Sequence, residues 1–166
     1  MAGPLTIRTY TSKIFGQNAY LVRCEATGEW AAIDPGGEAD AMAGALEAEG
    51  GALKAILLTH AHLDHLEGVA TLAERCPAPI YLNPADRPLY DAAPQQAAMF
   101  GHTIRTPPPP DAELRGGTAF RLGSCDLEVR NVPGHFHGQR CHRDHRRRYL
   151  LRRVGLLLAR PVYGNL

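Results

Sequence analysis

The feature that most constrains this chain is a cluster of three histidines and one aspartate within six positions, His60-Ala61-His62-Leu63-Asp64-His65. Together with the preceding Thr59, the cluster directly follows the apolar run 55–58, which is typical of a buried strand, and it precedes apolar residues at helical spacing over 66–73. We therefore predict a strand-to-helix turn at the carboxyl end of a sheet strand, where α/β sheets place their sites. A turn can direct adjacent side chains to one point, whereas a regular helix separates residues one or two positions apart.

These residue types indicate metal chemistry. Imidazole nitrogens and carboxylate oxygens bind zinc at about 2.0–2.2 Å, and a catalytic site keeps one position open for water. The alternative is that Asp64 caps the following helix and that the histidines are ordinary surface residues. A metal site accounts for all four residues together, so we expect His60, His62, Asp64 and His65 to be metal ligands.

The same stretch resembles the signature of the metallo-β-lactamase-fold hydrolases, and the resemblance extends along residues 1–135. Upstream, Asn-Ala-Tyr-Leu-Val at 18–22 and Ala-Ile-Asp-Pro-Gly-Gly at 32–37 look like the family's opening strands and loop. Downstream, Val132-Pro133-Gly134-His135 looks like the loop that supplies a further metal-binding histidine. Within the family, Asp-Pro-Gly-Gly at 34–37 and the segment 95–101 look most similar to small glyoxalase-II-type hydrolases, which act as hydroxyacylglutathione hydrolases.

The resemblance implies an α+β fold, a four-layer αββα sandwich whose second half is incomplete here. It implies that His60, His62 and His135 hold a first metal, and that Asp64 and His65 contribute to a second. Asp64 is also the implied catalytic residue, because it can orient the attacking water. The implied cofactor is zinc, as one or two ions, with iron or manganese as alternatives. The implied substrate is a thioester of the acyl-glutathione type or a related ester or amide.

Strand and helix patterns alternate along most of the chain, as that fold requires. We expect strands over 5–10, 18–24, 30–34, 54–59, 79–82, 118–122 and 125–132, and helical segments over 39–48, 66–76, 84–90 and 94–101. The four prolines at 107–110 predict an extended loop. Asp34 either simply ends its strand or also orders the loop beside the metals, and the sequence leaves both open.

The length of 166 residues favours one domain. The start of the chain shows no secretory signal and no run reaches the ~20 apolar residues of a membrane span, so we expect a cytoplasmic protein that does not bind membranes. The four cysteines, at 24, 76, 125 and 141, have no paired spacing. We therefore expect reduced, isolated thiols, with those at 24 and 125 acting as small core residues.

The composition changes after His135, which divides the chain into a metallo-β-lactamase-like part, 1–135, and an Arg-rich tail, 136–166. The tail holds 8 of the 18 Lys and Arg residues and 1 of the 17 Asp and Glu residues, although the whole chain is nearly neutral at +1. It departs from the family's expected continuation and lacks the later aspartate and histidine that complete the second metal site. We expect a poorly ordered tail. The codons that residues 136–142 allow, read one base later, permit Ser-Thr-Gly-Ser-Val-Val-Thr, so a truncated or frame-shifted family member is one hypothesis.

Other functions for the tail are less well supported. His137, Cys141, His142 and His145 have zinc-compatible side chains, but no CxxC-like arm accompanies them. The arginines could bind phosphates, but no aromatic or groove-reading pattern favours a nucleic-acid partner. Three hypotheses for the whole chain therefore stay open: a zinc-dependent hydrolase of small thioesters or esters, an inactive metal-binding fragment of such an enzyme, and a mononuclear-iron persulfide dioxygenase-like protein of the same fold. The oligomeric state is not predicted.

Overall fold

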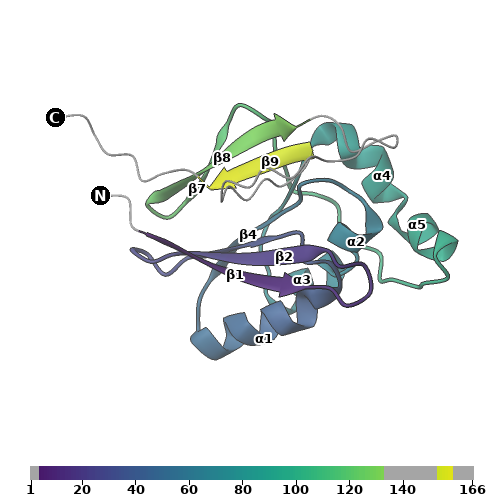
Figure 1. The fold of residues 1–166 in the computed structure, drawn as a ribbon, viewed down its shortest axis with the longest axis horizontal. Coiled ribbons are helices and arrows are strands. Elements are labelled where there is room, and N and C mark those ends of the chain that lie inside the picture. The colour runs from purple at the N-terminus through teal and green to yellow at the C-terminus, as the bar shows by residue number, and fades with distance from the viewer. Residues whose placement is uncertain (1–3, 133–152, 159–166) are drawn as a thin grey trace.

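The structure, a computed structural model, describes residues 4–132 and 153–158 (Figure 1). A six-stranded sheet forms its centre, with the strands in chain order, β1-β2-β3-β4-β5-β6. Strands β1 to β3 are antiparallel to one another, and β3 to β6 run parallel. The strands are β1 (Leu5–Thr11), β2 (Asn18–Cys24), β3 (Trp30–Ile33), β4 (Leu53–Leu57), β5 (Ile80–Leu82) and β6 (Ala112–Glu113).

A second, three-stranded antiparallel sheet of order β7-β8-β9 faces the first sheet (Figure 1). Its strands are β7 (Ala119–Leu122), β8 (Cys125–Val132) and β9 (Arg153–Leu158). Helices α1 and α3 lie on the other face of the large sheet, while α4 and α5 lie at one end of the molecule. The helical elements are η1 (Gly36–Glu38), α1 (Ala39–Glu49), α2 (Leu63–Leu66), α3 (Val69–Arg75), η2 (Pro84–Asp86), α4 (Arg87–Asp91) and α5 (Ala93–Met99).

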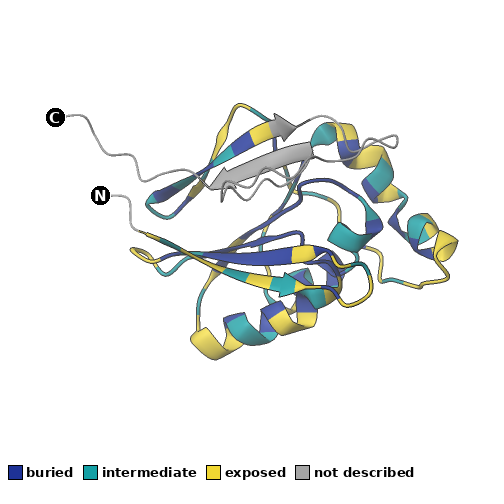
Figure 2. Ribbon diagram, in the orientation of Figure 1, coloured by how far each residue is buried: buried dark blue, intermediate teal, exposed yellow. Residues whose placement is uncertain are grey.

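The central strands are buried on both faces because each has a helical layer on one side and a sheet on the other (Figure 2). In β2, Ala19 and Leu21 point to the core beneath α1 and α3, whereas Tyr20, Val22 and Cys24 point to the core between the sheets. The side-chain period of two thus divides one continuous apolar run between two cores. This explains why the strands read as unbroken hydrophobic stretches.

The expected α+β fold of metallo-β-lactamase type, with sheets packed face to face and helices outside, is confirmed. The described residues build one helical layer and two sheets. Strand β6 was not predicted, since its two residues form a strand only by pairing with β5. Within the predicted tail, residues 153–158 form β9 along β8, where we expected no strand. The remainder of the 136–166 tail, and His135, lie outside the described residues, so the boundary at 135 stays a prediction. In the described part of the chain, no helix could cross a membrane.

Candidate metal centre

The predicted ligands lie where two parallel strands end side by side. Ile33, the last residue of β3, pairs with Leu57, the last residue of β4. Asp34 therefore follows β3 at the same sheet edge at which Thr59 and His60 follow β4. This is the carboxyl edge predicted from the sequence, and it brings together residues that are 25 positions apart.

Asp34 is the buried centre of this edge. Its side chain is fully buried, and its φ of 48° is the single positive value among the described non-glycine residues. Oδ1 accepts a hydrogen bond from the backbone N–H of Thr59 at 2.8 Å, and Oδ2 accepts one from the Thr59 hydroxyl at 2.6 Å. The Asp34 carbonyl accepts a third bond from Gln17 Nε2 at 2.9 Å. A left-handed conformation costs about 1–3 kcal/mol, and these bonds hold it in place. Of the two readings of Asp34, the structure supports the one in which it orders the loop.

The Thr59 hydroxyl determines which His60 nitrogen carries the proton. The single hydroxyl proton is donated to Asp34, so the Thr59 oxygen accepts from His60 Nδ1, which lies 3.1 Å away. His60 Nδ1 is then protonated, and Nε2 carries the lone pair. Nε2 accepts a hydrogen bond from Nδ1 of His62 at 3.0 Å, and a bound metal would replace the proton between them. Two nitrogens on one tetrahedral zinc, at 2.0–2.1 Å from it, are about 3.3 Å apart, so this spacing suits a shared cation.

His65 stands between two carboxylates. Its Nδ1 is 2.9 Å from Oδ2 of Asp34, off the axis of the ring N–H, and its Nε2 is 3.4 Å from Oδ2 of Asp64. Burial by itself would lower the pKa of His65, but Asp34 and then the charge of Asp64 raise it above its ordinary value. The Asp34 contact favours the proton on Nδ1, which directs Nε2 and the Asp64 oxygen toward the same space. A carboxylate behind a metal-binding imidazole is the usual arrangement in metal sites.

The candidate metal ligands form two pairs, His60 with His62 and Asp64 with His65. The imidazole rings are packed together, with centroids 4.6 Å apart for His60 and His62 and 4.1 Å apart for His60 and His65. Within residues 4–132 and 153–158, no group of three or more His, Cys, Asp or Glu side chains surrounds one point. The third ligand predicted for the first metal, His135, lies outside these ranges. The ligand assignments therefore stay predictions that the observed pairs support.

Two glycines let α2 approach η1 closely enough to place Asp64. A Cβ on Gly36 would lie 2.3 Å from the Asp64 carbonyl oxygen, and a Cβ on Gly68 would lie 2.0 Å from the Gly36 oxygen. On the other side of the ligand loop, Gln96 Nε2 donates to the Ala61 carbonyl at 3.0 Å and so ties α5 to the loop. The turn is held from both sides by packing and backbone contacts.

An exposed apolar rim adjoins the same edge. Phe15, in the β1–β2 loop, packs against Phe100 after α5 and against His102, with ring centroids 6.0 Å apart in both pairs. Ile14 and Met99 are 70% and 83% exposed beside these rings in the sequence. Burial raises the pKa of Glu67, the charge of His102 opposes that shift, and the charge of Asp64 adds to it.

Sequence reasoning missed three residues that support the ligands: Thr59, Gln17 and Gln96. Each acts by hydrogen bonding to a group far away in the chain, namely Asp34 for the first two and Ala61 for the third. Thr59 directly precedes the histidines, but nothing in the sequence indicates that its hydroxyl reaches Asp34. His102 matched no predicted ligand position, and it lies on the rim.

Comparisons with known proteins agree with this arrangement. Residues 13–151 match the family model of the metallo-beta-lactamase superfamily. A hydroxyacylglutathione hydrolase, GloC, from Haemophilus influenzae is 34% identical over 110 residues, 65% of this chain and 52% of its own length. The crystal structure of the B3 metallo-beta-lactamase BLEG-1 matches with a TM-score of 0.68 and 30% identity, over 78% of this chain and 63% of that one. The structure of TTHA1623 in a di-iron-bound form matches with a TM-score of 0.66 and 38% identity, over 77% and 62%.

The chain spans about half of the GloC length and under two thirds of both structures. The match nevertheless covers most of this chain, including the ligand turn and strands β2 to β8. The buried Asp34, the paired imidazoles and the two facing sheets thus occur in a sequence that matches one family over most of its length. This chain belongs to the metallo-β-lactamase superfamily.

Proposed function

We propose that this protein is a metal-dependent hydrolase that uses water to cleave a small thioester or a related ester or amide. The observation that carries the proposal is the pair of imidazole nitrogens, His60 Nε2 and His62 Nδ1, which lie 3.0 Å apart, with His60 linked through Thr59 to the buried Asp34. The superfamily supports hydrolase chemistry in general, and the thioester substrate rests on the similarity to GloC.

His60, His62 and His135 would hold one divalent cation, and Asp64 and His65 a second. A bound cation of this kind lowers the pKa of water to about 7 and polarises a carbonyl oxygen. Asp34 holds His65 and, through Thr59, fixes the His60 tautomer, so that both rings direct Nε2 to the site. Asp64 presents a carboxylate oxygen that can accept a proton from the attacking water.

Zinc is the metal that we propose first, because neutral imidazoles and carboxylates suit it. Iron is the second candidate, since the same donors suit it and TTHA1623 was crystallised in a di-iron-bound form. The apolar rim of Ile14, Phe15, Met99 and Phe100 favours a substrate with a hydrophobic portion next to the scissile bond.

The proposal is tested by measuring metal content and hydrolysis on the full chain. We expect one or two zinc or iron ions per chain, hydrolysis of acyl-glutathione thioesters within a panel that also holds esters and a β-lactam, and loss of turnover after chelation. Turnover that survives complete metal removal would contradict the proposal.

The second candidate is a metal-binding protein without turnover, which is favoured by the absence, within the described residues, of a group of three or more ligand side chains around one point. Bound metal with no hydrolysis of any panel member would identify it.

A further inference from the structure

Two cysteines that are 101 residues apart in the sequence meet between the two sheets. Cys24 ends β2 in the large sheet, and Cys125 begins β8 in the small sheet. Their Sγ atoms lie 2.9 Å apart, and both residues are buried in the core between the sheets. A disulfide bond is about 2.05 Å long, so the two sulfurs need to approach by less than ~1 Å to form one. The expected isolated thiols are therefore, in space, a pair.

The surroundings of this pair favour reaction at Cys24. Its Sγ also lies 3.4 Å from the Ser124 hydroxyl. Burial raises the pKa of the Cys24 thiol, but hydrogen bonds from Cys125, Ser124 and Thr27 outweigh this effect and lower it to about 6. A thiolate is the reactive form of cysteine toward oxidants. Cys76 differs, because burial and the charge of Glu47 raise its pKa.

A metal is a poorer explanation for the pair. Zinc in structural sites takes four Cys or His ligands. The described part of the chain offers no third His, Cys, Asp or Glu side chain that completes a site with Cys24 and Cys125. The buried position of the two sulfurs also favours a small oxidant over a bulky one.

We propose that Cys24 and Cys125 are a site of oxidative modification, at which hydrogen peroxide converts the two thiols into a disulfide that joins the sheets. The Cys24 sulfur attacks one peroxide oxygen, the O–O bond breaks, and Cys24 becomes a sulfenic acid as hydroxide leaves and takes up a proton to form water. The Cys125 sulfur then attacks the Cys24 sulfur, and the sulfenic oxygen leaves with the Cys125 proton as a second water. Two thiols are oxidised, and one peroxide is reduced to two waters.

The disulfide would join β2 of the large sheet to β8 of the small sheet. Cys24 lies at the end of β2 that is opposite to the ligand turn. Its closed loop of about 100 residues removes much of the freedom of the unfolded chain, so the oxidised form should be more stable. The inference does not depend on the proposed hydrolase activity, because Cys24 lies near the Trp30 end of β3, whereas Asp34 and the ligand turn follow its other end.

The test uses a Cys76→Ser, Cys141→Ser background, which retains only the two paired thiols. After peroxide treatment, unfolding and alkylation, we expect an unalkylated chain that is about 2 Da lighter and a peptide that joins residues 24 and 125. The unfolding temperature should rise by about 5–15 °C, and a reductant should remove the rise. Two alkylated thiols, or added oxygen without a cross-link, would overturn the proposal.

A second variant tests the order of the two steps. Cys125→Ala removes the resolving thiol, so peroxide should leave a sulfenic acid at Cys24 that a dimedone probe labels. The matched Cys24→Ala variant should show little label at Cys125. Equal labelling in both variants would contradict the assignment of Cys24 as the first thiol to react.

Discussion

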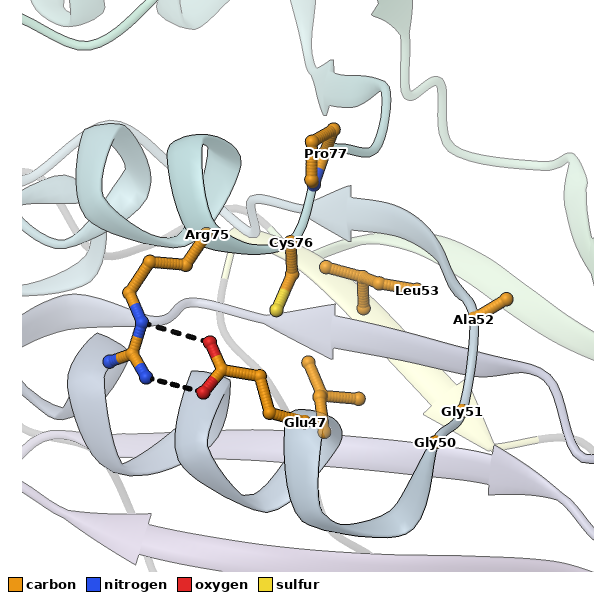
Figure 3. A pocket seen from close by; sticks show the side chains of 9 residues that line it. Glu47, Gly50, Gly51, Ala52, Leu53, Arg75, Cys76 and Pro77 are labelled. Atoms are coloured by element: carbon orange, nitrogen blue, oxygen red, sulfur yellow. Dashed lines mark hydrogen bonds and ion pairs between the residues drawn. The ribbon is translucent and has the colours of Figure 1, made fainter.

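The two ends of β4 hold polar groups in opposite ways. Beyond its carboxyl end, Asp34 is fully buried, accepts two hydrogen bonds from Thr59 and lies 2.9 Å from His65 Nδ1. Before its amino end, a pocket lined by Leu46, Gly50 to Leu53, Cys76 and Pro77 has its charges at the rim (Figure 3). There Arg75 donates two hydrogen bonds to the half-exposed Glu47 carboxylate, at 3.1 and 2.8 Å.

The two ends of β4 differ in whether water can reach their polar groups. At the amino end, water can replace any bond that Arg75 loses, so such a pair contributes about 0–1 kcal/mol. At the carboxyl end, a group that loses its partner stays buried and costs about 1–3 kcal/mol. Only the buried network can therefore impose a tautomer, a left-handed backbone and a fixed ring direction. The following five predictions test this contrast, from the largest effect to the smallest.

Replacing a predicted ligand should have the largest effect. We expect His62→Ala to lower turnover by about 10³-fold or more, because metal-derived stabilisation of the transition state is lost. Metal content and hydrolysis rate measure this. His102→Ala, a histidine on the rim, should retain its metal; equal loss in both variants would refute a specific role for His62.

Asp34→Asn should weaken metal binding by about 10–100-fold without unfolding the protein. Asparagine tolerates a positive φ and can still accept from the Thr59 N–H, but its NH₂ group cannot accept the Thr59 hydroxyl proton, so the His60 tautomer is no longer imposed. Metal titration checks this. Asp86→Asn, at another buried aspartate, should leave affinity unchanged, and unchanged affinity in Asp34→Asn would contradict the network.

Gly68→Ala should destabilise the fold by about 1–3 kcal/mol, since its Cβ would lie 2.0 Å from the Gly36 oxygen and 2.5 Å from the Ala39 Cβ. Gly44→Ala is the matched control, because nothing lies within 4 Å of its added Cβ in α1. It should stabilise by about 0.5–1 kcal/mol. Urea unfolding of both variants measures the difference, and two equal shifts would exclude close packing as the cause.

The stability of the metal-free protein should depend on pH through the protonation of His65. Because its folded pKa is raised, protonated His65 stabilises the fold below its unfolded pKa of about 6.5, and this contribution is lost as the pH rises through the folded pKa. The stability difference between wild type and His65→Gln should therefore shrink as the pH rises. The difference between the two proteins is the quantity to measure, because ionised Cys24, whose folded pKa is lowered, stabilises both of them as the pH rises. A constant difference from pH 6 to 9 would contradict the assignment.

Arg75→Gln should have the smallest effect. It removes ion pairs to Glu47 and Asp40 at the rim of the pocket, so we expect a loss of about 0–1 kcal/mol and no change in metal affinity. Thermal unfolding and metal titration measure both quantities. A loss of stability as large as that of Gly68→Ala would show that solvent exposure does not limit the contribution of these ion pairs to stability.

Local pattern was enough to predict most of the strands and the ligand turn. The apolar run before His60 and the helical spacing after His65 are consequences of neighbouring residues, and they were confirmed as β4 and α3. Helix α2 begins already at Leu63, so Asp64 and His65 lie on a short helix and not in the predicted turn. The predicted strand over 30–34 and the observed β3 differ only at Asp34, which leaves the strand because its φ is positive. Strand β6 escaped prediction because two residues carry no periodicity of their own.

The sequence by itself determined where the histidines lie along the chain and which chemistry they suit, since residue type and local periodicity are properties of neighbours. Only the tertiary structure decided that Asp34 orients them through Thr59, and that Cys24 faces Cys125. Both contacts join residues 25 and 101 positions apart, brought together by sheet pairing and by packing of the sheets. Hydrogen bonds and sulfur contacts act over about 3 Å, so no local pattern encodes them.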